Sequence, residues 1–228
     1  MTVLRSRGES WQRDPRPGAS VIAAGGLLLA FVALGVALVF APAFIRFDAA
    51  VSEAIRSVTW PWVESVARAA TWLGDFWPMA ALTAGAGAAL WVMGRRTSSA
   101  TLVLTVALGS LLGSILKLLF GRLRPALEVA RIALPESYSF PSGHALSSLL
   151  FFGSVAFLIV LHVRSLRVSA LGVGLCGLAV FAIGMGRVYL GVHFLGDIIG
   201  SWLLGAGLLA LMVMISARWG AGSEERVS

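Results

Sequence analysis

Apolar residues fill six stretches of the chain, and each stretch is long enough to cross a lipid bilayer as a helix. A hydrocarbon core of about 30 Å needs about 20 helical residues. Little chain remains outside these stretches, so the pattern predicts an all-α, polytopic membrane protein built as a six-transmembrane-helix bundle. The six predicted spans are 21–40, 76–93, 100–120, 145–162, 168–185 and 198–217.

The segment 47–75, between spans one and two, is too polar to cross the bilayer. Val51, Ile55 and Val58 recur at helical spacing, a second apolar set follows, and Pro61 separates the two. We therefore expect two short interfacial helices here, with their tryptophans at the depth of the lipid headgroups. A cap packed over the bundle is a second interpretation, and it is compatible with the first.

Composition supports the membrane class, since 58% of the residues are hydrophobic and the mean hydropathy is +0.88. The net charge of +7 would suit a nucleic-acid partner. The basic residues, however, gather beside the spans, where the positive-inside rule accounts for them, so nucleic acid is excluded and the lipid bilayer is the expected partner. They are Arg5, Arg7, Arg13, Arg16, Arg95, Arg96, Arg164, Arg167, Arg218 and Arg226.

This charge distribution predicts a multi-pass protein of the cell (inner) membrane with both termini in the cytoplasm. We expect a flexible cytoplasmic N-terminal segment over 1–19, a six-helix membrane domain over 20–217 and a cytoplasmic C-terminal tail over 218–228. The remaining polar residues fall on the predicted extracytoplasmic side. Charge at the edge of a span is costly, so these residues need a functional explanation.

The first polar cluster is KLLFGRLRP, at the end of span three. Lys117 and Arg124 are seven residues apart, about two helical turns, so a continuing helix would place them on one face. Arg122 would fall off that face. Pro125 disfavours helical geometry at Arg124 and marks the end of the span. Long cations that reach for lipid headgroups are the alternative explanation.

The second cluster is the tetrad Pro141, Ser142, Gly143 and His144, directly before span four. Proline and serine are typical of a helix start, and glycine lets an anion approach the backbone closely. The free amides and the helix dipole at such a start favour negative charge. An ordinary capped helix that happens to carry a histidine is the alternative.

The third cluster is GRVYLGVHFLGD, between spans five and six. His193 and Asp197 are four residues apart, so one helical turn would bring them together. A carboxylate that binds one imidazole nitrogen leaves the other nitrogen as a lone pair, which is the orienting half of a catalytic triad. Arg187 begins the same segment. A polar loop before a helix is the alternative.

Together the clusters bring two histidines, one carboxylate, one lysine and two arginines to one face of the membrane. No second carboxylate and no cysteine is expected beside them, so a metal site would have too few ligands. Fixed cations, a helix N-terminus and two histidines suit the transfer of a phosphoryl group.

The three clusters resemble, in order and spacing, the signature of the type 2 phosphatidic acid phosphatase superfamily, in its membrane branch of lipid phosphate phosphatases. That signature is Lys, six residues, Arg-Pro, then Pro-Ser-Gly-His, then Ser-Arg, five residues, His, three residues, Asp. Gly186 stands where the family usually has serine, which removes one hydroxyl contact. The matching residues here are Lys117, Arg124, Pro125, Pro141, Ser142, Gly143, His144, Arg187, His193 and Asp197.

The resemblance implies a hydrolase that needs no metal and no cofactor. His193 would attack phosphorus and form a phosphohistidine, with Asp197 holding its tautomer. His144 would protonate the leaving oxygen of the lipid and then deprotonate the attacking water. The phosphate-binding residues would be Lys117, Arg124, Ser142, Gly143 and Arg187.

The expected substrate is a lipid phosphate, and polyprenyl (undecaprenyl) diphosphate, phosphatidic acid and phosphatidylglycerophosphate fit the motifs equally. A lipid phosphotransferase would pass the same phosphoryl group to an alcohol instead of water. A non-enzymatic protein that binds or transports anionic lipids would use the cations alone. The paired His193 and Asp197 argue against this last alternative, since binding alone needs no oriented imidazole.

Overall fold

The computed structural model describes residues 17–224, with side chains over 20–215. Every regular element in this range is a helix, as predicted. The predicted terminal segments, 1–19 and 218–228, reach beyond the described residues, and their flexibility and location stay predictions. The elements are α1 (Pro17–Phe40), α2 (Pro42–Arg56), α3 (Pro61–Gly74), α4 (Phe76–Val92), α5 (Arg96–Phe120), the single turn η2 (Leu127–Val129), α6 (Gly143–His162), α7 (Leu166–Tyr189) and α8 (Leu195–Glu224).

Within residues 17–224, five helices are long and apolar enough to cross a bilayer: α1, α5, α6, α7 and α8. The remaining predicted span, 76–93, forms α4, which is apolar but only 17 residues long. The segment between spans one and two forms the two shorter helices α2 and α3. A count of five candidate spans plus one shorter apolar helix is therefore what the structure supports.

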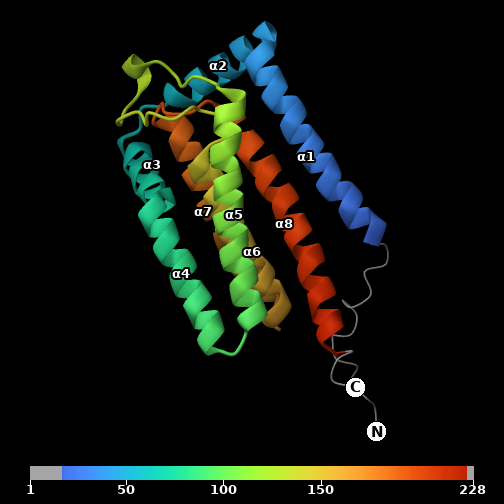
Figure 1. The fold of residues 1–228 in the computed structure, drawn as a ribbon. Helices are drawn as coiled ribbons and strands as arrows, with labels where there is room; N and C mark the ends of the chain where they lie inside the picture. The colour runs from blue at the N-terminus through green and yellow to red at the C-terminus, as the bar shows by residue number, and fades with distance from the viewer. Residues whose placement is uncertain (1–16, 225–228) are drawn as a thin grey trace.

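The long helices and α4 run side by side, and the two other short helices, α2 and α3, lie toward one end of the bundle (Figure 1). Helix α6 packs against α5, α7 and α8, while α1 packs mainly on α8 and α3 on α7. The start of α1 and the end of α8 lie at the opposite end, together with the α4–α5 and α6–α7 turns (Figure 1). The upper end therefore holds α2, α3, the segment 121–142 and the α7–α8 turn.

Local sequence explains where several elements begin and end. Pro42 and Pro61 occupy the first turn of α2 and α3, where the missing N–H costs nothing. Gly121 ends α5 in the left-handed conformation, with φ 58°, which glycine adopts without strain. The chain then leaves α5 as an irregular segment instead of continuing its helix.

Phe140 anchors the end of this irregular segment in the core. Its ring is fully buried, stacks on Phe31 with the ring centres 5.4 Å apart, and meets Phe120 edge-on at 4.8 Å. Such aromatic contacts add to the hydrophobic stabilisation from burial. Because Phe140 is fixed, Ser139 on one side and the start of α6 on the other are held at defined positions.

Candidate active site

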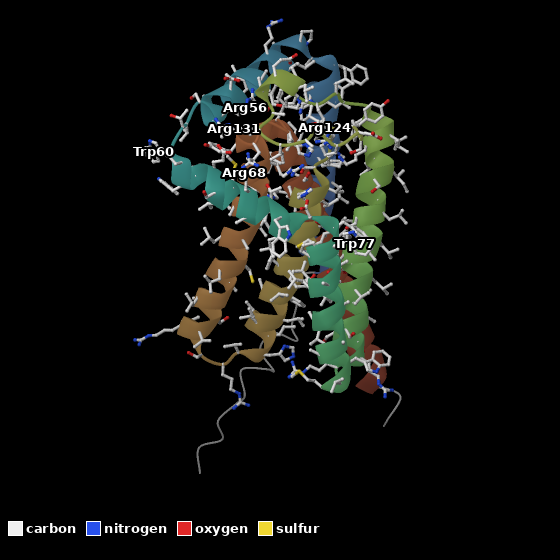
Figure 2. All side chains as sticks on the ribbon, turned by 90° about the vertical axis from the view of Figure 1, so that its left-hand side faces the viewer. Arg56, Trp60, Arg68, Trp77, Arg124 and Arg131 are labelled. Carbon is white, nitrogen blue, oxygen red and sulfur yellow. The ribbon has the colours of Figure 1, made fainter. Side chains whose placement is uncertain are left out.

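Three segments that are distant in sequence meet at the upper end of the bundle: residues 121–142, the first turn of α6 and the α7–α8 turn. Figure 2 labels Arg124 at this end of the molecule, which also carries Arg56, Arg68 and Arg131. The three polar clusters predicted from the sequence therefore lie at one end of the molecule, and their side chains make the contacts below.

His193 lies in the turn before α8 and is only 1% exposed. Its Nδ1 is 3.1 Å from Oδ2 of Asp197, so the predicted contact is present although α8 begins only at Leu195. Its Nε2 is 3.1 Å from a guanidinium nitrogen of Arg124. Burial lowers the pKa of His193 to about 3 against the opposing effect of Asp197. The carboxylate at Nδ1 and the guanidinium at Nε2 favour a neutral imidazole with its proton on Nδ1 and a lone pair on Nε2.

Asp197 is completely buried and fully hydrogen-bonded. Besides His193, its carboxylate accepts from the Ser139 hydroxyl and, at 3.0 Å, from the backbone N–H of Phe194. The guanidinium of Arg122 donates to its other oxygen at 2.5 Å. A carboxylate with this many donors stays ionised and fixed, as an orienting group requires.

Arg122 was expected to lie away from the Lys117–Arg124 face. In the structure it connects two buried carboxylates, those of Asp197 and Asp48. It is 7% exposed, and its second guanidinium nitrogen binds Asp48 of α2 at 2.6 Å. Asp48 also accepts from the backbone N–H of Gly196, at 2.8 Å. Sequence spacing could not find Asp48, because its partners lie 74 and 148 residues away.

The predicted shared helical face of Lys117 and Arg124 is wrong, because α5 ends at Phe120 and Arg124 lies in the irregular segment. The two side chains nevertheless converge, since both donate to the carbonyl oxygen of Tyr138, at 2.8 Å from Lys117 and 3.4 Å from Arg124. Burial lowers the pKa of Arg124, and the charge of Asp197 opposes that shift.

Two buried donors near these residues have no hydrogen-bond partner among the described residues: Oγ of Ser142 and Nε of Arg187. Ser142 occupies the N-cap position of α6, yet its side chain makes no capping bond. Arg187 is 3% exposed. A buried, unpaired donor is costly, so both point to an anion that would bind them. Space is open beside Gly143, where an added Cβ would meet nothing within 4 Å.

His144 projects from the first turn of α6, and its Nε2 lies 2.7 Å from Oδ1 of Asp75. The expectation that no second carboxylate joins the site is therefore wrong. Asp75 lies between α3 and α4, far from the motifs in sequence, and no spacing rule would have linked it to His144. Within the described part of the chain, no group of three or more His, Cys, Asp or Glu side chains forms a candidate metal cluster.

An apolar groove of about 660 Å³ runs from this site between α4 and α5. Lys117, Gly143 and His144 lie at its polar end, and Val103 marks its far end on α5. Fourteen residues of helix separate Lys117 from Val103, about 21 Å. The groove is lined mainly by small and apolar side chains, so it suits a long hydrocarbon chain whose polar end reaches the histidines.

Comparison with known proteins adds an independent observation. A family model described as the PAP2 superfamily matches residues 98–221, a range that includes all three clusters. The chain is 30% identical over 166 residues to a phosphatidylglycerophosphatase B of Bacillus subtilis, covering 72% of this chain and 81% of that one. It is 33% identical over 121 residues to an undecaprenyl-diphosphatase of Sulfolobus acidocaldarius, covering 51% and 54%.

Solved structures give the same picture. A transmembrane PAP2-type phosphatidylglycerolphosphate phosphatase from Bacillus subtilis superposes with a TM-score of 0.75 at 28% identity, covering 90% of this chain and 97% of that one. The LpxE of Aquifex aeolicus superposes with a TM-score of 0.55 at 25% identity, covering 72% and 93%. Both likenesses extend well beyond the three clusters, over most of the helical bundle.

Proposed function

Because the chain belongs to the PAP2 superfamily, we propose that it is a membrane lipid phosphatase that works through a phosphohistidine intermediate. The resemblance inferred from the three clusters is thereby confirmed at the level of the family. The observation that carries the mechanism is the arrangement of His193. Its Nδ1 meets Asp197 while its Nε2 faces Arg124, so a lone pair points toward fixed positive charge.

In the proposed first step, Nε2 of His193 attacks phosphorus and the bond from phosphorus to the lipid oxygen breaks. His144 gives its proton to that oxygen, and the alcohol leaves. In the second step, His144 takes a proton from water, the water oxygen attacks phosphorus, and inorganic phosphate leaves His193 free. Both steps balance without any other reactant.

The phosphate oxygens would bind Lys117, Arg124 and Arg187, with Ser142 and the Gly143 amide as further donors. The unpartnered nitrogen of Arg187 and hydroxyl of Ser142 support this assignment, because a bound phosphate would satisfy both. Fixed cations stabilise charge that develops in the transition state, so the proposed reaction needs no metal ion.

The lipid tail would lie in the groove between α4 and α5, which places the scissile bond beside His144. Relatives named for phosphatidylglycerophosphate and for undecaprenyl diphosphate support a lipid phosphate or diphosphate as the substrate class. We further propose that α4 is the sixth span. The site would then face the extracytoplasmic side, and both termini the cytoplasm.

The decisive experiment measures phosphate release from a panel of lipid phosphates by the purified protein in detergent, with excess chelator present. His193→Ala should lower the rate by on the order of a thousandfold or more while the protein remains folded. His162→Ala is the matched control. His162 is exposed at the opposite end of α6, and its ring bonds the carbonyl oxygen of Leu158 in its own helix at 2.9 Å.

The control variant should keep the activity of the unaltered protein. Full activity in His193→Ala would refute the assignment of His193 as the nucleophile. Binding of lipid phosphate without any release of phosphate would refute the phosphatase and favour a binding or transport protein.

A further inference from the structure

Asp75 occupies a position where an aspartate side chain ordinarily accepts a hydrogen bond from the backbone of the following helix. It is the N-cap residue of α4, with φ −64° and ψ 159°, and aspartate is among the preferred residues there because it accepts from the free amides of the first turn. Its side chain makes no such bond. Oδ1 instead meets Nε2 of His144 at 2.7 Å. The carboxylate thus forgoes a stabilising cap to bind the imidazole.

The surrounding backbone holds this contact in place. Gly74, the preceding residue, packs so closely on the ring that an added Cβ would be 3.1 Å from Cδ2 of His144. The ring is held from its own side by the first turn of α6. The Asp75 side chain is 48% exposed and that of His144 19%, so the pair lies at the wet edge of the site and not in the core.

The two histidines are bound through opposite nitrogens. Asp197 contacts Nδ1 of His193, so Nε2 is the nitrogen that can react with a substrate. Asp75 contacts Nε2 of His144, so Nδ1 is the nitrogen that can face a substrate. The charges of Arg187 and Arg124 reach both imidazoles. Asp75 is the carboxylate that counters these two cations at His144, as Asp197 does at His193.

We propose that Asp75 is a positioning residue for the general acid: it holds His144 with Nδ1 directed at the leaving oxygen and stabilises the imidazolium before the proton is given up. This inference rests on the proposed phosphatase reaction. The proton moves from Nδ1 to the lipid oxygen as the bond from oxygen to phosphorus breaks. The proton on Nε2 stays shared with Asp75 throughout.

Dependence on the leaving group provides the test. The leaving group of dodecyl phosphate is a strongly basic alkoxide, so its departure needs a proton from a general acid. 4-Dodecyl-2-nitrophenyl phosphate carries the same apolar tail, but its leaving group is a weakly basic phenolate that can depart without a proton. For Asp75→Asn, kcat/KM should fall at least about tenfold on the alkyl ester and stay within about threefold on the nitrophenyl ester. Because kcat/KM reports the steps up to departure of the leaving group, slower hydrolysis of the phosphohistidine does not enter.

Asparagine is as favourable as aspartate at an N-cap position, so the substitution should not destabilise the start of α4. Glu53→Gln is the matched control, since it makes the same change in an exposed carboxylate that pairs with Arg56 on α2, and both of its rates should match the unaltered protein. Equal loss on the two esters, or no loss on either, overturns the inference while the phosphatase stands. Absence of phosphate release by the unaltered protein overturns both.

Discussion

Two buried arginines at this site have opposite surroundings. Arg122 is saturated by carboxylates, with Asp48 at 2.6 Å and Asp197 at 2.5 Å, and its guanidinium lies 4.6 Å from the ring centre of Phe194. Arg187 has a buried nitrogen without a partner in the described part of the chain. Arg122 therefore links α2 to α8, whereas Arg187 keeps a donor that the phosphate of the proposed reaction would satisfy.

This contrast predicts that the two arginines respond differently to the same substitution. Arg187→Met should lower kcat/KM about a hundredfold and leave the thermal midpoint of unfolding unchanged or higher, because an unpaired buried donor is removed. Arg122→Met should lower the stability by about 3–5 kcal/mol, because two buried carboxylates lose their counter-charge. Thermal unfolding in detergent and phosphate release, measured side by side, check both. A large loss of stability in Arg187→Met would contradict the assignment.

At the scale of elements, α3 is held against the site by close backbone contacts. Gly74 faces Ile183 and His144, and an added Cβ there would come within 2.6 Å of the Ile183 side chain. Gly186, on α7, faces the backbone of Ala67 on α3, where an added Cβ would lie 3.1 Å from its carbonyl oxygen. This contact leaves little room for a larger side chain at position 186.

Gly74→Ala should therefore displace the end of α3 and Asp75 with it. We expect a loss of stability of about 1–3 kcal/mol from overpacking and a clear fall in activity. Gly85→Ala on α4 is the control, because an added Cβ there meets nothing within 4 Å, and alanine is the better helix former. If Gly74→Ala were as active and as stable as Gly85→Ala, the close packing of α3 would be refuted.

Hydropathy predicted the long helices, because an apolar segment in a bilayer must satisfy its own backbone hydrogen bonds and does so as a helix. Motif spacing predicted that His193 would meet Asp197, since only four residues separate them. It misplaced Lys117 and Arg124, because the left-handed Gly121 ends α5 and the irregular segment brings Arg124 back by tertiary contacts.

Asp48, Asp75 and Ser139 gave no signal in one sequence, because what makes them part of the site is contact with residues far along the chain. Arg122 was visible, but a helical wheel placed it away from the site. Polar residues in and beside apolar segments were the sequence signal that indicated the site. In the structure, the burial of Arg187, His193 and Asp197 separates them from exposed polar residues at the ends of the helices.

On the scale of the whole molecule, the groove between α4 and α5 predicts how the protein treats substrates of different length. Ala107 lines the groove on α5, so Ala107→Phe should obstruct the tail. We expect kcat/KM to fall about tenfold for a long-chain phosphatidic acid and to hold for a dibutyryl one, because only the long tail uses this binding energy. Ala170→Phe, on an exposed face of α7, is the control and should leave both rates unchanged. Equal loss on both lipids would contradict a tail groove.

The bridge from Asp48 through Arg122 to Asp197 has a consequence for how the protein matures during synthesis. A ribosome that has completed α7 has made Asp48 and Arg122 but neither His193 nor Asp197. The proposed nucleophile and its carboxylate would therefore be complete, and the bridge from Arg122 to Asp197 closed, only after the last helix has been made.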